Sequence, residues 1–252
     1  MVDSLMVVYG INTVMEALRA GRVRRLRVGP RADGRLERAL EIARRTGIPI
    51  DRVDPSALER ASRGGVHQGI VAVVEDAPDY SIAELLSHAA PQAPLIVVLD
   101  GIEDPHNVGA VLRTADAAGA HGVVRQARRA APLDGIVAKA SAGALAHVRV
   151  ATVVNIARAV EELTAAGVWT VGLTGDALER YDRVDLTLPT AIVLGAEGSG
   201  LRRLVRERCD RLVSIPMGGT VESLNVSVAA GVTLFEAVRQ RRVASERSLG
   251  PD

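Results

Sequence analysis

From residue 94 onward the chain contains short, continuous apolar runs, and this pattern restricts its possible folds more than any other feature. The runs are LIVVLD (95–100), GVV (122–124), VWTVGL (168–173), AIVLG (191–195) and RLVSI (211–215). Segments with helical spacing of apolar residues lie between several of them. Strands of a parallel sheet that is covered by helices on both faces are apolar throughout rather than alternating. The pattern therefore predicts an α/β domain over residues 94–242.

A separate, smaller α/β unit is predicted over residues 1–75. Two stretches with apolar residues at helical spacing end at Gly21 and Gly47, and Asp54 followed by Pro55 predicts the start of a third helix. Short strands are predicted at RLRVG (25–29), IPIDRV (48–53) and IVAVVE (70–75). Residues 76–93, where prolines flank one short amphipathic helix, are interpreted as a linker, and residues 243–252 as a disordered tail.

Composition excludes several classes of protein. No apolar run approaches the ~18–20 residues that a membrane helix needs, and the N-terminus lacks the basic-then-apolar order of a signal peptide. Cys209 is the only cysteine, which excludes an internal disulfide and a multi-cysteine metal site. The five histidines are scattered without an i,i+4 pair, so no metal is expected. These features indicate a cytoplasmic protein without membrane contact.

Charge is informative only through its distribution, because the formal net charge is +1. Ten arginines lie between Arg19 and Arg45, against three acidic residues, and this local excess could contact phosphate. The alternative is a surface filled by arginine through compositional bias, since Lys139 is the only lysine. Aromatic residues make up 2% of the chain, so RNA recognition would depend on arginine and backbone rather than on base stacking.

Ligands of parallel α/β sheets bind at the carboxyl ends of the strands, so the loops after the apolar runs are the candidate sites. After residues 95–100, Asp104-Pro105 turns the chain, Asn107 is expected to cap a helix, and Arg113 lies on its polar side. After 191–195, Glu197 stands among glycines. A surface arginine and a solvated loop acid are the alternative interpretations of Arg113 and Glu197.

The third loop, after residues 211–215, contains Gly218 and Gly219 and then Ser223 and Asn225 at the start of a long helix. Glycines let main-chain groups approach a ligand closely. In the second loop, glycines 195, 198 and 200 follow the order G-x-x-G-x-G, whereas a dinucleotide site has G-x-G-x-x-G, so a dinucleotide-dependent oxidoreductase is disfavoured. The G-x-S-x-G sequence of a hydrolase is also absent.

At these three loops the sequence resembles the SpoU/TrmH branch of the SPOUT RNA methyltransferases. The matching stretches are DGIEDPHNVGAVLRTADAAGAHGVV (100–124), IVLGAEGSGL (192–201) and SIPMGGTVESLNVSVAAGVTLFEAVRQR (214–241). YGINTVMEALRAG (9–21) and VHQGIVAVVE (66–75) resemble the substrate-binding domain of the branch that methylates guanosine 2′-hydroxyls of large-subunit (23S) rRNA.

The resemblance implies an α/β fold with two parts. The C-terminal part would be a parallel-sheet SPOUT methyltransferase domain with a deep trefoil knot, which is rare. The N-terminal part would be a small α/β RNA-binding domain of the ribosomal-protein type. It also implies a homodimer, S-adenosylmethionine as cosubstrate, and RNA, most readily 23S rRNA, as the partner. The segment VVRQARRAAP (123–132) departs from the family pattern, which affects the expected substrate contacts of that loop.

The resemblance also implies roles for individual residues. It assigns Arg113 as the catalytic residue and gives it four supporting residues, Asn107, Glu197, Ser223 and Asn225. It assigns cofactor binding to main-chain groups of Gly195, Ile215 and Leu224, with Gly218 allowing the chain to fold over the cofactor. Two alternatives stay open at this stage: methylation of a tRNA ribose, and a non-catalytic RNA-binding protein of the same fold.

Overall fold

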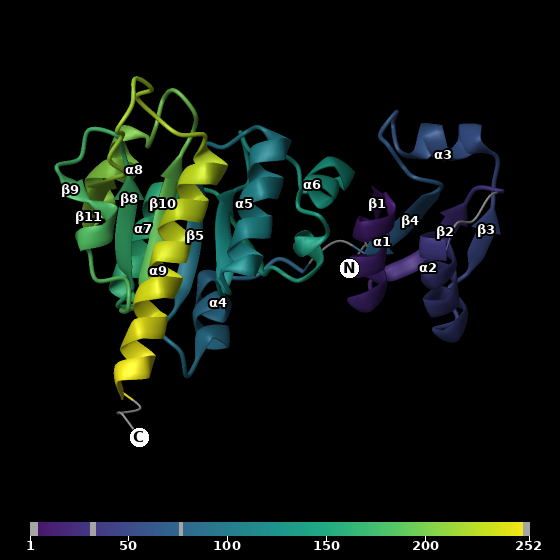
Figure 1. Cartoon of the computed structure of the whole chain (residues 1–252), viewed down its shortest axis with the longest axis horizontal. Coiled ribbons are helices and arrows are strands. Elements are labelled where there is room, and N and C mark those ends of the chain that lie inside the picture. Colours follow the sequence, from purple (N-terminus) through teal and green to yellow (C-terminus); the bar gives the residue numbers. More distant parts are fainter. Residues whose placement is uncertain (1–4, 31–33, 76–77, 249–252) are drawn as a thin grey trace.

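The computed structural model describes residues 5–30, 34–75 and 78–248, which form two α/β units built on separate sheets (Figure 1). The N-terminal sheet has the order β1-β4-β2-β3, with β4 antiparallel to both of its neighbours and β2 parallel to β3. Its strands are β1 (Leu5–Tyr9), β2 (Val23–Val28), β3 (Ile50–Arg52) and β4 (Ile70–Glu75). Its helices are α1 (Ile11–Arg19), α2 (Gly34–Arg45) and α3 (Pro55–Ala61).

The C-terminal sheet has seven strands in the order β7-β6-β5-β10-β8-β11-β9, and every neighbouring pair is parallel. The prediction of a parallel sheet is therefore confirmed. The strands are β5 (Leu95–Asp100), β6 (Gly122–Gln126), β7 (Val150–Val153), β8 (Trp169–Leu173), β9 (Glu179–Arg180), β10 (Thr190–Gly195) and β11 (Arg211–Ser214).

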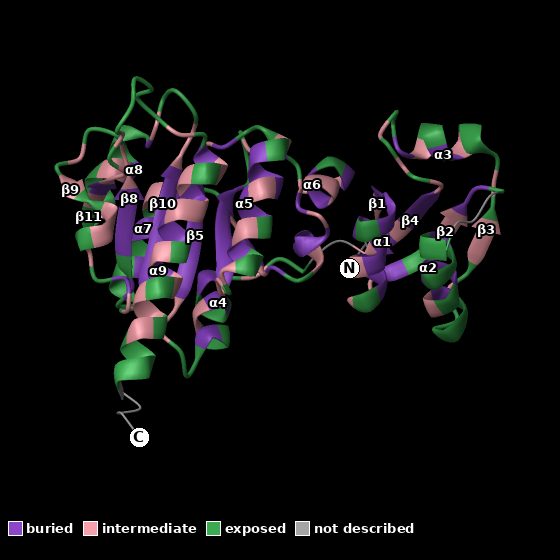
Figure 2. Ribbon diagram, viewed as in Figure 1, coloured by how far each residue is buried: buried purple, intermediate pink, exposed green. Residues whose placement is uncertain are grey.

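Helices cover both faces of this sheet, which explains why its strands are apolar throughout (Figure 2). Along β5, Val97 and Leu99 belong to one core, while Ile96 and Val98 belong to the core on the other face. Full burial of each such side chain stabilises the fold by about 1.5–3 kcal/mol. The first face carries α5 (Pro105–Ala117) and α9 (Val226–Ser248), and the second carries α4 (Ile82–Ala89), α7 (Ile156–Ala165) and α8 (Arg203–Arg208).

The segment interpreted as a linker contains α4, which packs into the core of the C-terminal unit. Leu85 is fully buried there, and Ser81 and Glu84 form a reciprocal capping box at the start of the helix. Just upstream, the Asp79 carboxylate accepts a hydrogen bond of 2.8 Å from the backbone N–H of Thr152 in β7. Residues 79–89 are therefore fixed to the edge of the sheet.

The two units meet at α6 (Gly135–Ala140) and the following short 3-10 helix (Ala144–Ala146). A Cβ atom added at Gly135 would lie 2.5 Å from the carbonyl oxygen of Val7, so only glycine fits against β1 here. The Lys139 ammonium donates to the carbonyl of Val66 at 3.0 Å and lies 5.3 Å from the centroid of the Tyr9 ring. The N-terminal unit thus docks directly on the C-terminal unit.

The long C-terminal helix differs from the sequence-based expectation at its end. Residues 243–248 were predicted to be disordered, but α9 continues to Ser248, with an ion pair of 3.7 Å between Arg242 and Glu246 one turn apart. Residues 249–252 of the predicted tail lie outside the described part of the chain. Within the described residues, no helix combines the length and apolar character that crossing a membrane requires.

Candidate active site

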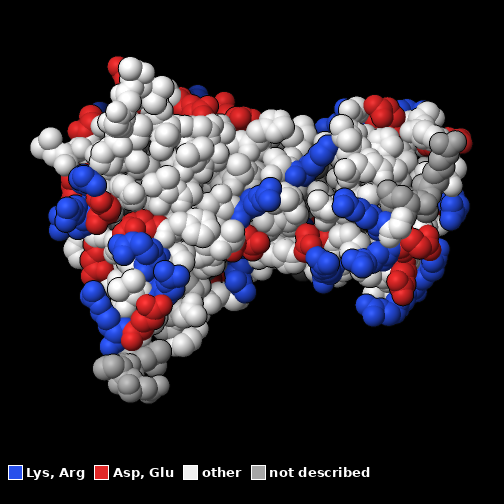
Figure 3. Space-filling model, in the orientation of Figure 1, with Lys and Arg blue, Asp and Glu red and all other residues white. Residues whose placement is uncertain are grey.

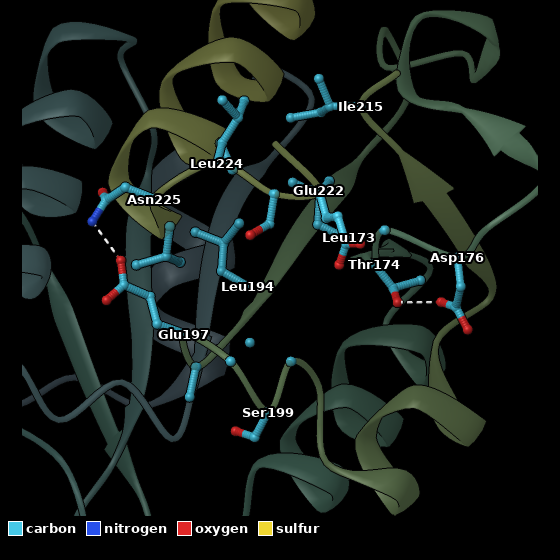
Figure 4. Close-up of a pocket in the computed structure, with 18 of the residues that line it drawn as sticks. Leu173, Thr174, Asp176, Leu194, Glu197, Ser199, Ile215, Glu222, Leu224 and Asn225 are labelled. Atoms are coloured by element: carbon cyan, nitrogen blue, oxygen red, sulfur yellow. Dashed lines mark hydrogen bonds between the residues drawn. The ribbon is translucent and has the colours of Figure 1, made fainter. Parts of the chain in front are cut away.

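Three loops at the carboxyl ends of the central strands enclose a cavity of about 640 Å³ (Figure 4). They follow β8, β10 and β11, and the last of them runs into α9. Leu173, Leu194, Ile215 and Leu224 form apolar parts of the wall, and Figure 4 shows Leu194 and Leu224 on the side of Glu197 and Asn225. The volume lies within the range of small-molecule pockets, and apolar walls with a few polar groups are typical of them.

The structure brings most of the predicted site residues together. Those that line the cavity are Gly195, Glu197, Ile215, Ser223, Leu224 and Asn225. Gly218 lies outside its lining, and an added Cβ atom there would meet nothing within 4 Å. Asn107 and Arg113 lie on α5 rather than in the cavity wall, but Asn107 is hydrogen-bonded to Asn225.

Asn225 connects three of the predicted residues. Its side-chain amide nitrogen donates to Asn107 Oδ1 at 2.9 Å and to Glu197 Oε1 at 2.5 Å. Its Oδ1 accepts from the backbone N–H of Ser227 at 2.9 Å and from the Ser227 hydroxyl at 2.6 Å, which fixes the orientation of the amide at the start of α9. The first loop, the second loop and α9 are thus joined through one side chain.

The expected role of Asn107 as a helix cap was wrong. Asp104 is the N-cap of α5, and its carboxylate accepts from the backbone N–H of His106 at 3.0 Å. Pro105 then occupies the first helical position, where its missing N–H costs nothing. Asn107 is therefore free to point away from its own helix end and accept from Asn225, and only 8% of it is exposed.

Arg113 lies six residues further along α5, about 9 Å along the helix axis at 1.5 Å per residue. Its side chain is exposed, and no other described residue forms a hydrogen bond or ion pair with it. Its neighbour Thr114 faces Gly231 of α9, where an added Cβ atom would lie 3.7 Å from Thr114 Cγ2. Arg113 therefore stands beside the α5–α9 contact with its side chain exposed.

Glycine is favoured at each of the three glycine positions of the second loop, but for different physical reasons. A Cβ atom added at Gly195 would lie 2.2 Å from the carbonyl carbon of Gly200, because the loop doubles back against its own start. Ala196 and Gly200 bond to each other in both directions at 3.2 and 2.9 Å. Gly198 and Gly200 adopt positive φ angles of 77° and 65°, which disfavour other residues. The G-x-x-G-x-G spacing thus encodes a tight turn that holds Glu197 at the cavity.

At the opposite end of the cavity lie residues that the sequence analysis missed. The Thr174 hydroxyl donates to Asp176 Oδ1 at 2.5 Å, and Arg206 donates to the same oxygen at 3.1 Å (Figure 4 shows the first bond). The bonds from Thr174 and Arg206 lower the pKa of Asp176 below its ordinary value. The signal was available, since Thr174 directly follows the apolar run 168–173 and strand-end loops carry ligands.

Two further observations limit the chemistry of the site. Burial, together with Asp210 and Asp100, raises the pKa of Cys209 to about 12, so this thiol stays protonated and is a poor nucleophile. Over the described ranges, no three His, Cys, Asp or Glu side chains are grouped so as to hold a metal ion. What the site offers is a half-apolar cavity, main-chain groups at glycine turns, and a carboxylate–amide cluster joined to the helix that carries the exposed Arg113.

Comparison with known proteins gives two family matches. Residues 94–235 match the SpoU rRNA Methylase family, and residues 7–80 match the domain described as RNA 2′-O ribose methyltransferase substrate binding. The chain is 44% identical over 242 residues to the 23S rRNA (guanosine-2′-O-)-methyltransferase RlmB of Pseudomonas putida, covering 94% of this chain and 97% of that protein. It is 43% identical to the putative TrmH family tRNA/rRNA methyltransferase YacO of Bacillus subtilis, and the match covers 95% of this chain and 97% of that protein.

Solved structures show the same similarity. The SpoU methyltransferase AviRb from Streptomyces viridochromogenes, crystallised in complex with the cofactor AdoMet, superimposes with a TM-score of 0.81 at 30% identity, covering 95% of this chain and 91% of AviRb. The TrmH/SpoU tRNA modifying enzyme of A. aeolicus has a TM-score of 0.56 at 30% identity and covers 66% of this chain and 85% of its own.

Proposed function

Because the chain belongs to the SpoU rRNA methylase family, we propose that it transfers the methyl group of S-adenosylmethionine to a ribose 2′-hydroxyl of RNA. The substrate best supported is a guanosine of 23S rRNA. The observation that carries the proposal is the hydrogen-bonded cluster of Asn107, Glu197 and Asn225, which stands between the cavity and the helix of Arg113. Family membership supplies the reaction class, and this cluster supplies the means to perform it in this chain.

The cavity fits S-adenosylmethionine in size and in chemistry. Its volume of about 640 Å³ accommodates a nucleoside with an amino-acid side arm. Leu194, Ile215 and Leu224 offer apolar surface to the purine, and the glycine turn at Gly195 leaves main-chain groups accessible to its polar edges. We assign Gly195, Ile215, Leu224 and the adjoining Gly218 loop to cofactor binding. When bound, the cofactor supplies an electrophilic methyl group on a positively charged sulfur.

Arg113 is proposed to act by position and charge. A guanidinium is a poor general base, so a role in proton removal is not assigned to Arg113. Being exposed and without a partner among the described residues, it can contact the RNA and stabilise the negative charge that develops on the 2′-oxygen. The proton of the hydroxyl then passes to water or to an RNA phosphate oxygen.

The supporting cluster has a separate task in this proposal. Asn225, fixed by Ser227, holds Glu197 and Asn107 in place, and Asn107 belongs to the same helix as Arg113. The carboxylate of Glu197 and the hydroxyl of Ser223 face the cavity, where they order its RNA-facing end. These residues position the reacting groups, which is worth more to the rate than an additional binding contact.

The N-terminal unit supports rRNA over tRNA as the substrate. Residues 7–80 match a substrate-binding family, and the relatives that carry 23S rRNA in their names align along nearly the whole chain. By contrast, the tRNA modifying enzyme of A. aeolicus covers 66% of it. The arginines of residues 19–45 are proposed to contact RNA phosphates. A tRNA ribose is the second candidate substrate, favoured by the mixed tRNA/rRNA name of the Bacillus subtilis relative.

Three further features are proposed from the family. The first is a homodimer that pairs through α5 and the first half of α9. Figure 3 shows this face of the C-terminal unit largely without charged side chains, and Val228 and Phe235 of α9 are each 50% exposed. The second is a trefoil knot in the segments after β10 and β11, supported by the insertion of β10 between β5 and β8. The third is a cytoplasmic location, where rRNA is modified.

The proposal is tested by incubating the purified chain with methyl-labelled S-adenosylmethionine and separate pools of rRNA and tRNA. We expect label in 23S rRNA, and loss of label in an Asn225→Ala variant that still folds. Label in tRNA alone would keep the reaction and replace the substrate. Absence of label from naked RNA and from precursor ribosomal particles, with the cofactor bound, would contradict the enzymatic proposal and favour a non-catalytic RNA-binding protein.

A further inference from the structure

We propose that Arg202 is a positioning residue that couples the cofactor loop to an arginine-bearing loop on the RNA side of the site. Arg202 is the N-cap residue of α8 and directly follows the glycine turn that carries Glu197. The cofactor loop comprises residues 196–201, and the basic loop comprises residues 127–133 after β6. The assignment of the two loops to cofactor and RNA rests on the proposed function, whereas the coupling rests on the contacts below.

The first contact holds the cofactor loop to the central strand. The backbone N–H of Arg202 donates to Asp100 Oδ2 at 2.8 Å, and its Nε donates to Asp100 Oδ1 at 2.5 Å. A second guanidinium nitrogen forms an ion pair with the same carboxylate. Asp100 is the last residue of β5 and is 0% exposed, and a buried carboxylate needs a charged, hydrogen-bonded partner. Arg202 provides that partner.

The second contact extends the connection to the next strand. The terminal guanidinium nitrogen of Arg202 also donates to Gln126 Oε1 at 2.7 Å. Gln126 is the last residue of β6 and is 4% exposed. Its own amide nitrogen donates to the carbonyl oxygen of Arg129 in the basic loop. Arg129 has a φ of 52°, in the left-handed region that side chains disfavour, so this bond helps to hold a conformation that the residue would not adopt readily.

One side chain at the start of α8 therefore joins the ends of two strands, β5 and β6. Arg202 lies 102 residues from Asp100 and 76 residues from Gln126. On one side the connection fixes the turn that places Glu197 at the cavity. On the other side it fixes the loop that exposes Arg128 and Arg129. A guanidinium is suited to this role because its planar fork serves a carboxylate and an amide oxygen at once.

The basic loop overlaps the segment VVRQARRAAP (123–132), which departs from the family pattern. The coupling gives this departure a physical meaning, because Gln126 and Arg129 are both part of it. Two exposed arginines held in the loop after β6 match the chemistry of RNA phosphates. We infer that the contacts of Arg202 link the conformation of the cofactor loop to that of the basic loop, so that binding of cofactor and binding of RNA influence each other.

Two variants and one control separate the two sets of contacts that Arg202 makes. We call the contact with Asp100 the cofactor-loop arm, and the contact through Gln126 with Arg129 the basic-loop arm. Arg202→Ala removes both arms. Gln126→Glu keeps an acceptor for Arg202 but replaces the donor to Arg129 by a carboxylate, so it breaks only the basic-loop arm and leaves Asp100 paired. Arg203→Ala is the matched control, because Arg203 is the adjacent arginine, is exposed, and pairs only with Glu207 on its own helix among the described residues.

Amide hydrogen exchange of the free protein is the first readout, since it requires neither turnover nor ligand. Arg202→Ala should accelerate exchange in residues 196–202 and in 127–133. Gln126→Glu should accelerate it in 127–133 alone, and Arg203→Ala should change neither loop. Unchanged exchange in 127–133 for both test variants would overturn the coupling. If Arg202→Ala does not fold, Gln126→Glu decides the matter.

Ligand measurements are the second readout, and they separate positioning from general stability. Arg202→Ala should weaken S-adenosylmethionine binding by calorimetry by about tenfold or more, as expected for loss of charge-assisted hydrogen bonds. Gln126→Glu should raise the KM for RNA about tenfold while cofactor affinity stays within about twofold of wild type. Equal effects of Gln126→Glu on both ligands would overturn the division into two arms. An inactive wild-type protein would count against the proposed function, while the exchange result would still decide the coupling.

Discussion

The side-chain nitrogen of Asn225 donates to Asn107 and Glu197 at once, at 2.9 and 2.5 Å, across 118 and 28 residues of sequence. An amide is the neutral group that can donate twice from one nitrogen while accepting through its oxygen. This relationship makes the first loop, the second loop and the start of α9 a single unit. A substitution at Asn225 should therefore disturb the first loop, the second loop and the start of α9 together.

Replacing Asn225 by Asp tests this unit with almost no change in size. The two donated bonds are lost, and a second carboxylate would face Glu197. We expect kcat to fall by about 10–100-fold, the range for loss of hydrogen bonds to a charged group. Steady-state kinetics with labelled cofactor measures this. Ser227→Ala, which removes one of the two donors to Asn225 Oδ1, should have the smaller effect. Equal kinetics for Asn225→Asp and wild type would contradict the role of the cluster.

Arg113→Lys tests how the guanidinium acts. Lysine retains the positive charge but presents a point charge instead of a planar fork. If Arg113 positions the RNA through paired hydrogen bonds, kcat should fall by at least about tenfold while cofactor affinity stays unchanged. Single-turnover kinetics and calorimetry give the two values. Near-normal turnover would show that charge alone is sufficient and that the paired geometry is unnecessary.

Gly195→Ala tests the tight turn beside the cavity. The new methyl group would lie 2.2 Å from the carbonyl carbon of Gly200, so the loop must move. We expect a loss of about 1–3 kcal/mol in the free energy of unfolding, typical of overpacking, and a large fall in cofactor affinity. Gly34→Ala in α2 is the control, because an added Cβ atom there meets nothing within 4 Å and the residue lies outside the cavity lining. Denaturant unfolding and calorimetry on both variants should separate them, and similar results for the two would refute the steric argument.

His121 predicts a pH dependence of stability. Its Nδ1 accepts from the backbone N–H of Leu95 at 3.0 Å, which requires a neutral ring on that side. Burial, followed by the charges of Arg241 and Arg149, lowers the pKa of His121 below its ordinary value of 6.5. Between the folded and unfolded values the unfolded chain binds more protons, so stability rises with pH through that window and is lost as the pH falls below about 6.5.

The measurement is the melting temperature across this pH range for wild type and His121→Gln. The wild-type Tm should fall more steeply toward acid than that of the variant, which has no proton to bind. Parallel curves would show that His121 does not contribute to the acid sensitivity.

The sequence predicted the parts of the fold whose signal is local. Burial on both faces produces continuous apolar runs, and these located the strands of the parallel sheet. The expectation for Asn107 failed because Asp104, next to a proline, is an equally good N-cap residue. Residue spacing alone does not show which of the two begins the helix. The end of α9 was missed because the residues after 242 are polar, although they form helix with support from Arg242 and Glu246.

The contacts within the site were less accessible from sequence, because they join positions that are distant along the chain. Asp176 lies in the loop after β8 and Arg206 lies in α8, 30 residues away, and no glycine pattern marks the loop of Asp176. The pairing of Asp100, Gln126 and Arg202 depends on the order of strands in the sheet, which apolar runs do not specify. The roles of Arg113 and its supporting residues, and of Gly195, Ile215, Leu224 and Gly218, stay predictions.

The most direct test of the central claim is alkaline digestion of RNA that the protein has labelled with methyl-labelled S-adenosylmethionine. Alkali cleaves RNA through attack by the 2′-oxygen, so a 2′-O-methyl group protects the following phosphodiester bond. We predict label in alkali-resistant dinucleotides with guanosine on the 5′ side, incorporated about 10–100-fold more slowly when Asn225→Asp replaces wild type. Label recovered in mononucleotides would place the methyl group on a base and contradict the account.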